Sequence, residues 1–238
     1  MAGNNNMSTS ANKTDGLFTV KKHSGGTQQV ACSPFKILIY GTTYVERLNS
    51  YLNTQGQGHS NLHLDETFCK VFCWHGGLQV RSEQHEHDSM FRQLDIIYLH
   101  IGSNDIAESP DTLPDEVATT VMNLASLLMT RYRQKCVIVS QLLSRFLEPF
   151  EGFNHKIQVT NARLMELCQE ANFDVSYWRH RAGLWQPNQH IYADDGIHLS
   201  DTVGNNLFMR SIRDAVLRHI RWYCKPGDVK QKKRKAPV

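Results

Sequence analysis

An aspartate and a histidine that could act as a proton-transfer pair stand three positions apart in the segment 194–199, Asp-Asp-Gly-Ile-His-Leu. In a tight loop, the Asp195 carboxylate can accept a hydrogen bond from the imidazole Nδ1–H of His198. This fixes the tautomer and leaves Nε2 free as a general base. A capped turn with a surface histidine is the alternative. In a chain with 12 histidines, the pair therefore needs support from other residues.

A hydroxyl that such a base could activate follows the first predicted strand. Gly41 permits a tight turn there, and Thr43 stands two residues later. A side chain at that position would be exposed at the amino terminus of a helix, which favours a developing anion. The alternative is that Thr42 or Thr43 only caps the helix, a common role for threonine.

Two further loops carry groups that could stabilise an oxyanion. The sequence Gly-Ser-Asn-Asp at 102–105 follows a predicted strand, and the Asn104 amide could donate a hydrogen bond to an oxyanion. A Gly-Asn turn is the alternative for this segment. The paired glycines Gly76 and Gly77 follow another strand, and they would let a backbone N–H approach a ligand closely. A plain turn explains those two glycines equally well.

Short apolar runs that alternate with helical patterns would position these loops. Continuous apolar runs are typical of a parallel sheet that is covered on both faces, and strand–helix alternation favours a doubly wound α/β domain. Residues 117–128 place apolar side chains at i, i+4, i+7 and i+11, and the last helix is predicted from about 200 to 222. We therefore expect a flavodoxin-like, three-layer fold with chemistry at the carboxyl ends of the strands. The five predicted strands span 36–40, 68–74, 94–101, 136–142 and 173–177.

Composition and charge set the wider limits. The chain has 238 residues with 40% hydrophobic and 21% charged side chains, which excludes a collagen-like or wholly disordered protein. We predict a disordered polar segment at 1–33, one folded domain at 34–224 and a basic disordered tail at 225–238. No apolar run reaches about 18 residues, so no membrane helix is predicted. Residues 1–29 lack the apolar core of a secretory signal, which predicts an intracellular protein, cytoplasmic or nuclear, with its six cysteines reduced.

Taken together, the four loops resemble the SGNH (GDSL-like) hydrolase family. The blocks of that family are a Gly-Asp-Ser loop, a glycine, a Gly-x-Asn-Asp and an Asp-x-x-His. The resemblance covers about 36–221, which is all of the predicted ordered block. The sequence Trp-Arg-His-Arg at 178–181, followed by Asp-Gly-Ile-His-Leu at 195–199, looks like a subgroup often associated with retroelement-like genes in animal genomes.

The resemblance assigns a role to each residue. His198 would be the general base and Asp195 its orienting partner, with Asn104 and the Gly77 amide as oxyanion donors and Gly76 as the alternative to Gly77. The serine nucleophile of the family falls on Thr43, and its loop aspartate falls on Thr42. Threonine is also a hydroxyl nucleophile, but its extra methyl stiffens χ1 and crowds the line of attack.

Two functions follow as expectations. The first is an esterase or deacylase that transfers an acyl group from a small ester substrate to Thr43, weakened or abolished by the loss of serine. The second is a catalytically dead domain of this type that binds a partner such as RNA. The chemistry of the family needs no metal or organic cofactor, and none is expected here.

Several histidines outside these loops allow more than one interpretation. His85 and His87 could hold a metal ion, but a solvated face explains them better. His100 is expected to be a hydrogen-bonded core residue. His180 and the arginines beside it either line the substrate cleft or pack against neighbouring tryptophans.

The basic tail carries most of the positive charge of the chain. Residues 225–238 hold six Lys or Arg and one Asp, against a net charge of +3 for the whole chain. Such a run fits nuclear targeting or a nonspecific nucleic-acid contact, and a solvated tail without a role is the alternative. The run consists of Lys230, Lys232, Lys233, Arg234 and Lys235.

Overall fold

A five-stranded parallel sheet with the strand order β2-β1-β3-β4-β5 forms the centre of the computed structural model. The structure describes residues 33–54, 61–75, 91–181 and 183–223. It confirms the predicted doubly wound, flavodoxin-like α/β fold. The strands are β1 (Phe35–Gly41), β2 (Cys69–His75), β3 (Ile96–His100), β4 (Cys136–Ser140) and β5 (Val175–Trp178).

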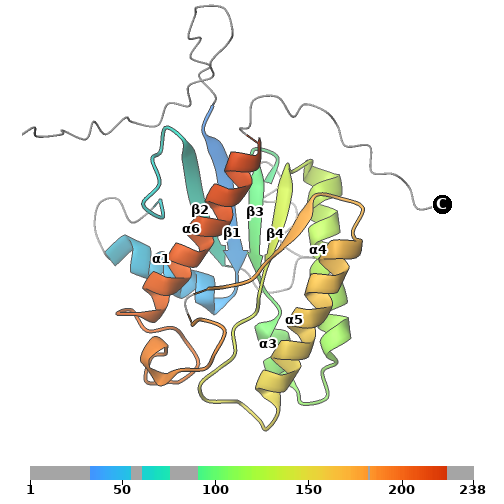
Figure 1. Cartoon of the computed structure of the whole chain (residues 1–238), viewed down its shortest axis with the longest axis vertical. Coiled ribbons are helices and arrows are strands. Elements are labelled where there is room, and N and C mark those ends of the chain that lie inside the picture. The colour runs from blue at the N-terminus through green and yellow to red at the C-terminus, as the bar shows by residue number, and fades with distance from the viewer. Residues whose placement is uncertain (1–32, 55–60, 76–90, 182, 224–238) are drawn as a thin grey trace, which may run out of the picture.

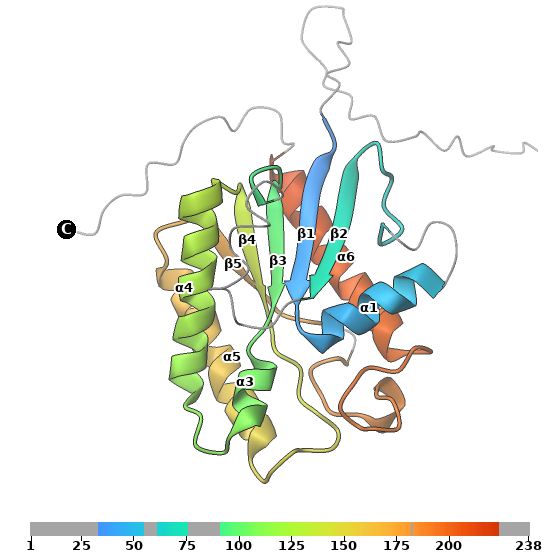
Figure 2. The same cartoon turned by 180° about the vertical axis from the view of Figure 1, so that it is seen from behind.

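Helices cover both faces of this sheet. Helices α1 and α6 lie on one face and helices α4 and α5 on the other, as Figures 1 and 2 show from opposite sides. The strand order reverses between β1 and β3, so ligands are expected at the carboxyl ends of these two strands. The helices are α1 (Thr43–Thr54), α3 (Ser103–Glu108), α4 (Pro114–Tyr132), α5 (Phe153–Glu170) and α6 (Gly204–Tyr223), with a 3-10 turn, η1 (Gln189–Ile191).

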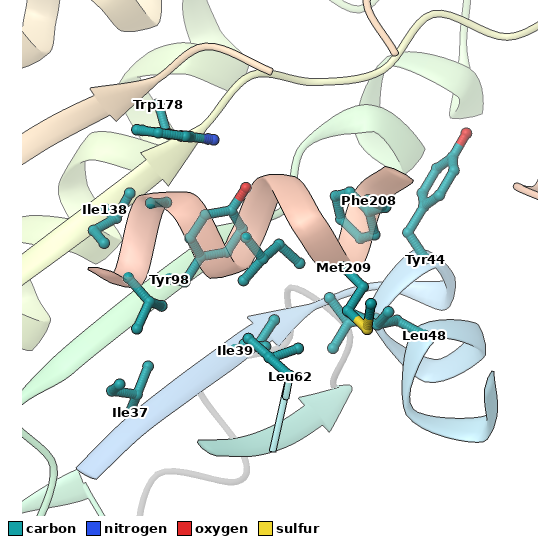
Figure 3. Close-up of a cluster of buried hydrophobic side chains, with 14 of the residues drawn as sticks. Ile37, Ile39, Tyr44, Leu48, Leu62, Tyr98, Ile138, Trp178, Phe208 and Met209 are labelled. Atoms are coloured by element: carbon teal, nitrogen blue, oxygen red, sulfur yellow. The ribbon is translucent and has the colours of Figure 1, made fainter. Parts of the chain in front are cut away.

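Both cores follow from the alternation of side chains along the strands. Ile37 and Ile39 of β1 pack with Phe208 of α6 in one core (Figure 3). Leu38, between them, points to the opposite face and joins the core under α4 and α5. The apolar pattern predicted at 117–128 is the buried face of α4.

Some predicted boundaries are wrong by a few residues. Strand β3 is shorter than the predicted 94–101, β4 ends at Ser140 rather than 142, and β5 begins two residues later than predicted. The last helix begins at Gly204, not near 200. The Ser200 hydroxyl accepts the Val203 and Gly204 backbone N–H groups at 3.3 and 3.1 Å, within the turn that leads into this helix.

The predicted loop at 102–106 is instead the start of the short helix α3. Gly102 precedes it with a φ of 115°, a backbone conformation that glycine adopts without strain. A Cβ there would also lie 3.1 Å from Val117 Cγ1. Asn104 therefore lies in the first turn of a helix rather than in an open loop.

At the end of β1, the backbone of Gly41 lies almost against the backbone of β3. Gly41 is in register with His100. A Cβ on Gly41 would lie 2.4 Å from Val45 Cγ2 and 2.6 Å from the His100 carbonyl oxygen. Only a residue without a side chain lets β1 approach β3 this closely before the chain turns into α1.

We therefore predict that Gly41→Ala lowers the free energy of unfolding by about 1–3 kcal/mol through overpacking. Urea denaturation of both proteins measures the difference. Combining the change with Val45→Ala removes one of the two clashes but leaves the His100 carbonyl in place, so it should restore little of the loss. Wild-type stability in Gly41→Ala would contradict the close approach.

Two buried histidines lie between the sheet and α6. His100 and His180 are 0% and 2% exposed, and both rings pack against Phe208. Their Nδ1 atoms lie 2.7 Å from Ser140 Oγ and 2.9 Å from Ser211 Oγ. Burial, and then the neighbouring His180, lowers the pKa of His100 to about 3, and burial lowers the pKa of His180 to about 3. The prediction of His100 as a hydrogen-bonded core residue is confirmed, and His180 is also a core residue.

This burial predicts loss of stability in mild acid. Between the ordinary histidine pKa of 6.5 and the folded value of about 3, only the unfolded chain binds a proton at each site. Stability is therefore complete above about pH 6.5 and falls as the pH is lowered, by up to about 1.4 kcal/mol per pH unit for each histidine. Urea denaturation at several pH values measures this slope. The double variant His100→Gln/His180→Gln should have a shallower slope, and an equal slope would contradict the assignment.

Other predictions fall partly or wholly outside the described residues. These include the polar segment 1–33, apart from its last residue, and the basic tail 225–238. They also include Gly76, Gly77 and the histidines at 85 and 87. Cys69, Cys136 and Cys168 are buried free thiols, and Cys73 is a half-buried one. Within the described part of the chain, no helix combines the length and the apolar character that a membrane crossing requires.

Candidate active site

A chain of three polar side chains lies at the carboxyl edge of the sheet, where strand order reverses. Thr43 Oγ1 is 3.3 Å from His198 Nε2, and His198 Nδ1 is 2.8 Å from Asp195 Oδ2. Thr43 is the first residue of α1, directly after β1, whereas the other two belong to the loop before α6. The structure thus brings together three of the residues singled out from the sequence, in the order hydroxyl, imidazole and carboxylate.

The Asp195 carboxylate is held in its charged form. Partial burial raises its pKa, but hydrogen bonds from the backbone and imidazole of His198 and from the backbone of Ile197 outweigh this and lower the pKa to about 2. The two backbone N–H groups donate to Oδ1 at 2.8 and 2.9 Å, which leaves Oδ2 for the imidazole. Arg47 lies 3.4 Å from the same Oδ2 on the exposed side. A charged acceptor of this kind holds the imidazole N–H of His198 at Nδ1 and leaves Nε2 free to accept a proton.

The loop that carries this pair is folded back on itself. Tyr192 and Leu199 form an antiparallel bridge, and the backbone N–H of Ala193 donates to the His198 carbonyl at 2.7 Å. Gly196 has a φ of 63°, and a Cβ there would lie 2.4 Å from Leu147 Cγ. The backbone N–H of Leu147 in turn donates to the Gly196 carbonyl at 2.9 Å. The segment before α5, through Leu147, therefore packs against this loop and forms a hydrogen bond with it.

Tyr44 ties the same loop to α1. Its hydroxyl donates to the Ile197 carbonyl at 2.6 Å, and its ring lies 5.9 Å from the His198 ring and 5.4 Å from the His100 ring. Burial raises the pKa of Tyr44 to about 12, against the opposing effect of the nearby Arg145 guanidinium. The hydroxyl therefore stays protonated as a donor. Thr43 and Tyr44 are consecutive, so this bond also holds the nucleophile candidate against its base.

The hydroxyls of the two threonines have different surroundings. Among the described residues, the buried Oγ1 of Thr42 has no hydrogen-bond partner, and the Oγ1 of Thr43 faces His198. The first turn is closed by the Thr42 carbonyl, which accepts from the backbone N–H groups of Val45 and Glu46. The alternative that either side chain simply caps α1 is therefore wrong.

Arg145, which the sequence did not single out, orients Asn104. Its Nη2 donates to Asn104 Oδ1 at 3.2 Å, and its guanidinium lies 4.7 Å above the Phe153 ring. The arginine is only 6% exposed, whereas Asn104 is exposed. With its oxygen held by Arg145, the amide of Asn104 leaves its NH₂ group free to donate. Arg145 belongs to no motif, so only the fold could identify it.

The remaining sequence candidates divide into two groups. Gly77, the second predicted oxyanion donor, and Gly76 lie outside the described residues. Ser103 is 1% exposed at the start of α3, too buried to serve in place of Thr43 as the hydroxyl of this site. Within the described ranges, no three His, Cys, Asp or Glu side chains gather as a metal site. The described part of the site thus offers a hydroxyl, a base with its carboxylate, and one side-chain amide.

Comparison with known proteins identifies the fold. No family model matches the chain, and no curated protein matches it. Among solved structures, a GDSL-like lipase from Bacteroides thetaiotaomicron aligns with a TM-score of 0.56 at 15% identity, over 77% of this chain and 88% of that one. A carbohydrate esterase family 3 protein from Talaromyces cellulolyticus gives 0.55 at 14% identity, over 79% and 98%.

A carbohydrate acetylesterase from Sinorhizobium meliloti aligns in the same way, with a TM-score of 0.52 at 15% identity, over 78% of this chain and 99% of that one. The alignments span nearly the whole of each esterase and the lipase. The chain therefore has the three-layer α/β/α fold in which these enzymes are built. At such low identity, the likeness extends to the fold alone.

The hydrogen bond from Tyr44 to Ile197 generates a prediction. Tyr44→Phe should lower the free energy of unfolding by about 1 kcal/mol, because the Ile197 carbonyl loses its donor. Tyr51→Phe is the matched control, since Tyr51 is a buried tyrosine on the same helix with no hydroxyl hydrogen bond in the described structure. Urea denaturation compares the two variants. Equal effects would mean that the bond does not hold the loop.

Proposed function

We propose that this chain is a hydrolase of the SGNH (GDSL-like) type that acts on carboxylic esters through Thr43. The observation that carries the proposal is the Thr43–His198–Asp195 chain, with contacts of 3.3 and 2.8 Å, at the carboxyl edge of the sheet. The shared fold with esterases and a lipase supports a carboxylic ester as the substrate class. The likeness of segment 178–181 to a retroelement-associated subgroup stays a prediction.

The chemistry divides into two half-reactions. Thr43 Oγ1 attacks the ester carbonyl carbon while His198 Nε2 takes the hydroxyl proton, and Asp195 stabilises the imidazolium that forms. The bond to the alcohol then breaks, and the same proton passes from Nε2 to the departing alcohol oxygen. Water attacks the acyl-threonine with His198 again as base, which releases the acid and restores the hydroxyl.

Hydrogen-bond donors must stabilise the negative charge that develops on the ester carbonyl oxygen in the transition state. Asn104 can donate from its side-chain amide, held in orientation by Arg145. Thr43 can donate from its backbone N–H, because the first N–H groups of a helix have no partner within the helix. The Gly77 N–H is proposed as a further donor from the family pattern alone. Each such donor contributes on the order of 10²–10³ in rate.

Threonine sets the rate that this site can reach. The 3.3 Å contact to His198 is longer than a good O–H···N hydrogen bond, although such contacts tighten when substrate binds. The γ-methyl restricts χ1 to few rotamers and occupies space beside the attacking oxygen. We therefore expect slow turnover. Serine at the same position would keep the hydroxyl and remove the obstruction.

The test is covalent labelling with a fluorophosphonate, followed by intact mass and peptide mapping. The reagent reports an activated hydroxyl without the true substrate. We predict one adduct on Thr43, absent from Thr43→Ala and His198→Ala, and formed at least about tenfold faster in Thr43→Ser because a misplaced nucleophile can cost about a hundredfold. Hydrolysis of p-nitrophenyl acetate should follow the same order.

Circular dichroism establishes that each variant is folded. If neither the wild-type chain nor Thr43→Ser forms an adduct or hydrolyses the ester, the hydrolase proposal is wrong. The alternative function, a catalytically inactive domain that binds a partner, then fits this fold better. An adduct on Ser103 or another hydroxyl would likewise overturn the role given to Thr43.

A further inference from the structure

A second surface with strong chemical character lies along the edge strand β5 and the carboxyl half of α6. Two hollows of about 550 and 440 Å³ adjoin there, because Trp178, Arg181 and Arg218 line both. Strand β5 is the last strand of the sheet (Figure 2), so this surface lies on a different part of the molecule from the Thr43 residue that follows β1. We call it the β5–α6 surface.

Arginines give the surface its charge. Arg179, Arg181, Arg218 and Arg221 line the two hollows, and Asp214 is the one carboxylate among the lining residues. None of the four guanidinium groups makes an ion pair or a hydrogen bond within the described structure. Unpaired arginines clustered around a hollow attract anions, and their planar groups bind phosphate through paired N–H donors.

The local folding explains why the arginines gather. Arg179 and Arg181 flank His180, which is buried, so their own side chains are exposed. Arg218, Arg221 and the exposed Trp222 are spaced i, i+3 and i+4 along α6 and therefore share one face of the helix. Two separate segments thus present the same charge to one surface.

Aromatic side chains accompany this charge. Trp185 and Trp222 are 45% and 63% exposed, and each lines one of the two hollows. Trp178 is buried beneath both hollows, and its Nε1 donates to Ser211 Oγ at 3.1 Å, which fixes the indole in place. Exposed indoles beside arginines provide flat faces on which bases can stack, next to groups that bind phosphate.

From these observations we propose that the β5–α6 surface binds single-stranded nucleic acid. Phosphates would contact the four arginines, and bases would stack on Trp185 and Trp222. An acidic peptide would use the charge but leave the indoles without a role, and a duplex would hide its base faces. The hollows have the volume of small-ligand sites, which suits one or two nucleotide units. This site is independent of the proposed hydrolase and of the basic tail.

Fluorescence anisotropy with a labelled mixed-sequence RNA oligomer of about 12 nucleotides tests the proposal. Arg218→Ala/Arg221→Ala should weaken binding on the order of tenfold or more, and lower the slope of log affinity against log salt by about 0.7 per lost phosphate contact. Trp185→Ala should weaken binding on the order of tenfold while leaving the salt slope unchanged. The same DNA sequence, tested in parallel, shows whether the 2′-hydroxyl contributes.

Two controls separate this surface from other sources of charge. Arg210→Ala removes an exposed arginine of α6 that does not line the hollows, and it should leave the affinity unchanged. In a second full-length variant, the five basic residues of the run at 230–235 are replaced by glutamine. The losses from Arg218→Ala/Arg221→Ala and Trp185→Ala should persist there, because the tail and the β5–α6 surface act separately.

Three outcomes would overturn the proposal. The first is unchanged binding in both surface variants. The second is binding that disappears with the tail charges alone. The third is polyglutamate binding as tight as RNA binding and insensitive to Trp185→Ala, which would assign the surface to acidic proteins. Thermal melting of each variant shows that it is folded, so lost binding can be attributed to the surface.

Discussion

The close approach of β1 to β3 is the constraint on which the rest of the structure depends. With no Cβ at Gly41, the two backbones meet at the point where both strands end, and a methyl there would lie 2.6 Å from the His100 carbonyl. Helices α1 and α3 consequently start beside each other. Thr43 and Asn104 occupy their first turns, so a backbone contact determines the relative position of a hydroxyl and an amide that are 61 positions apart.

Much of this architecture could be predicted, because fully buried parallel strands have continuous apolar sequences. The run at 96–100 is buried at every position, and its nearly unbroken apolar sequence predicts a strand. Helix α3 was missed because six residues are too short to show a helical period. Arg145 was missed for a different reason. Its importance comes from contacts with Asn104 and Phe153, and neither partner is near it in the sequence. A role that depends on contacts between segments far apart in the chain leaves no pattern in the local sequence.

Helix α6 connects the two functional surfaces proposed for this molecule. Its first turn follows the loop of Asp195 and His198, its second turn packs Phe208 against the buried histidines, and its last turns carry Arg218 and Arg221. The same helix thus supports a neutral, desolvated core on one side and a charged surface on the other. Because His100 and His180 stay uncharged, neither adds a positive charge to the core beneath the imidazole that would act as base.

The wide separation of Thr43 and His198 along the chain has a consequence for biosynthesis. These residues are 155 positions apart, and His198 stands shortly before α6. A ribosome releases the amino-terminal segments first, and contacts between distant segments form late because their loop closure costs the most entropy. The Thr43 hydroxyl is therefore complete and exposed to the cell while His198, its proposed base, has yet to be synthesised. If Thr43 and His198 react as proposed, the nascent chain would stay inert until α6 has docked onto the sheet.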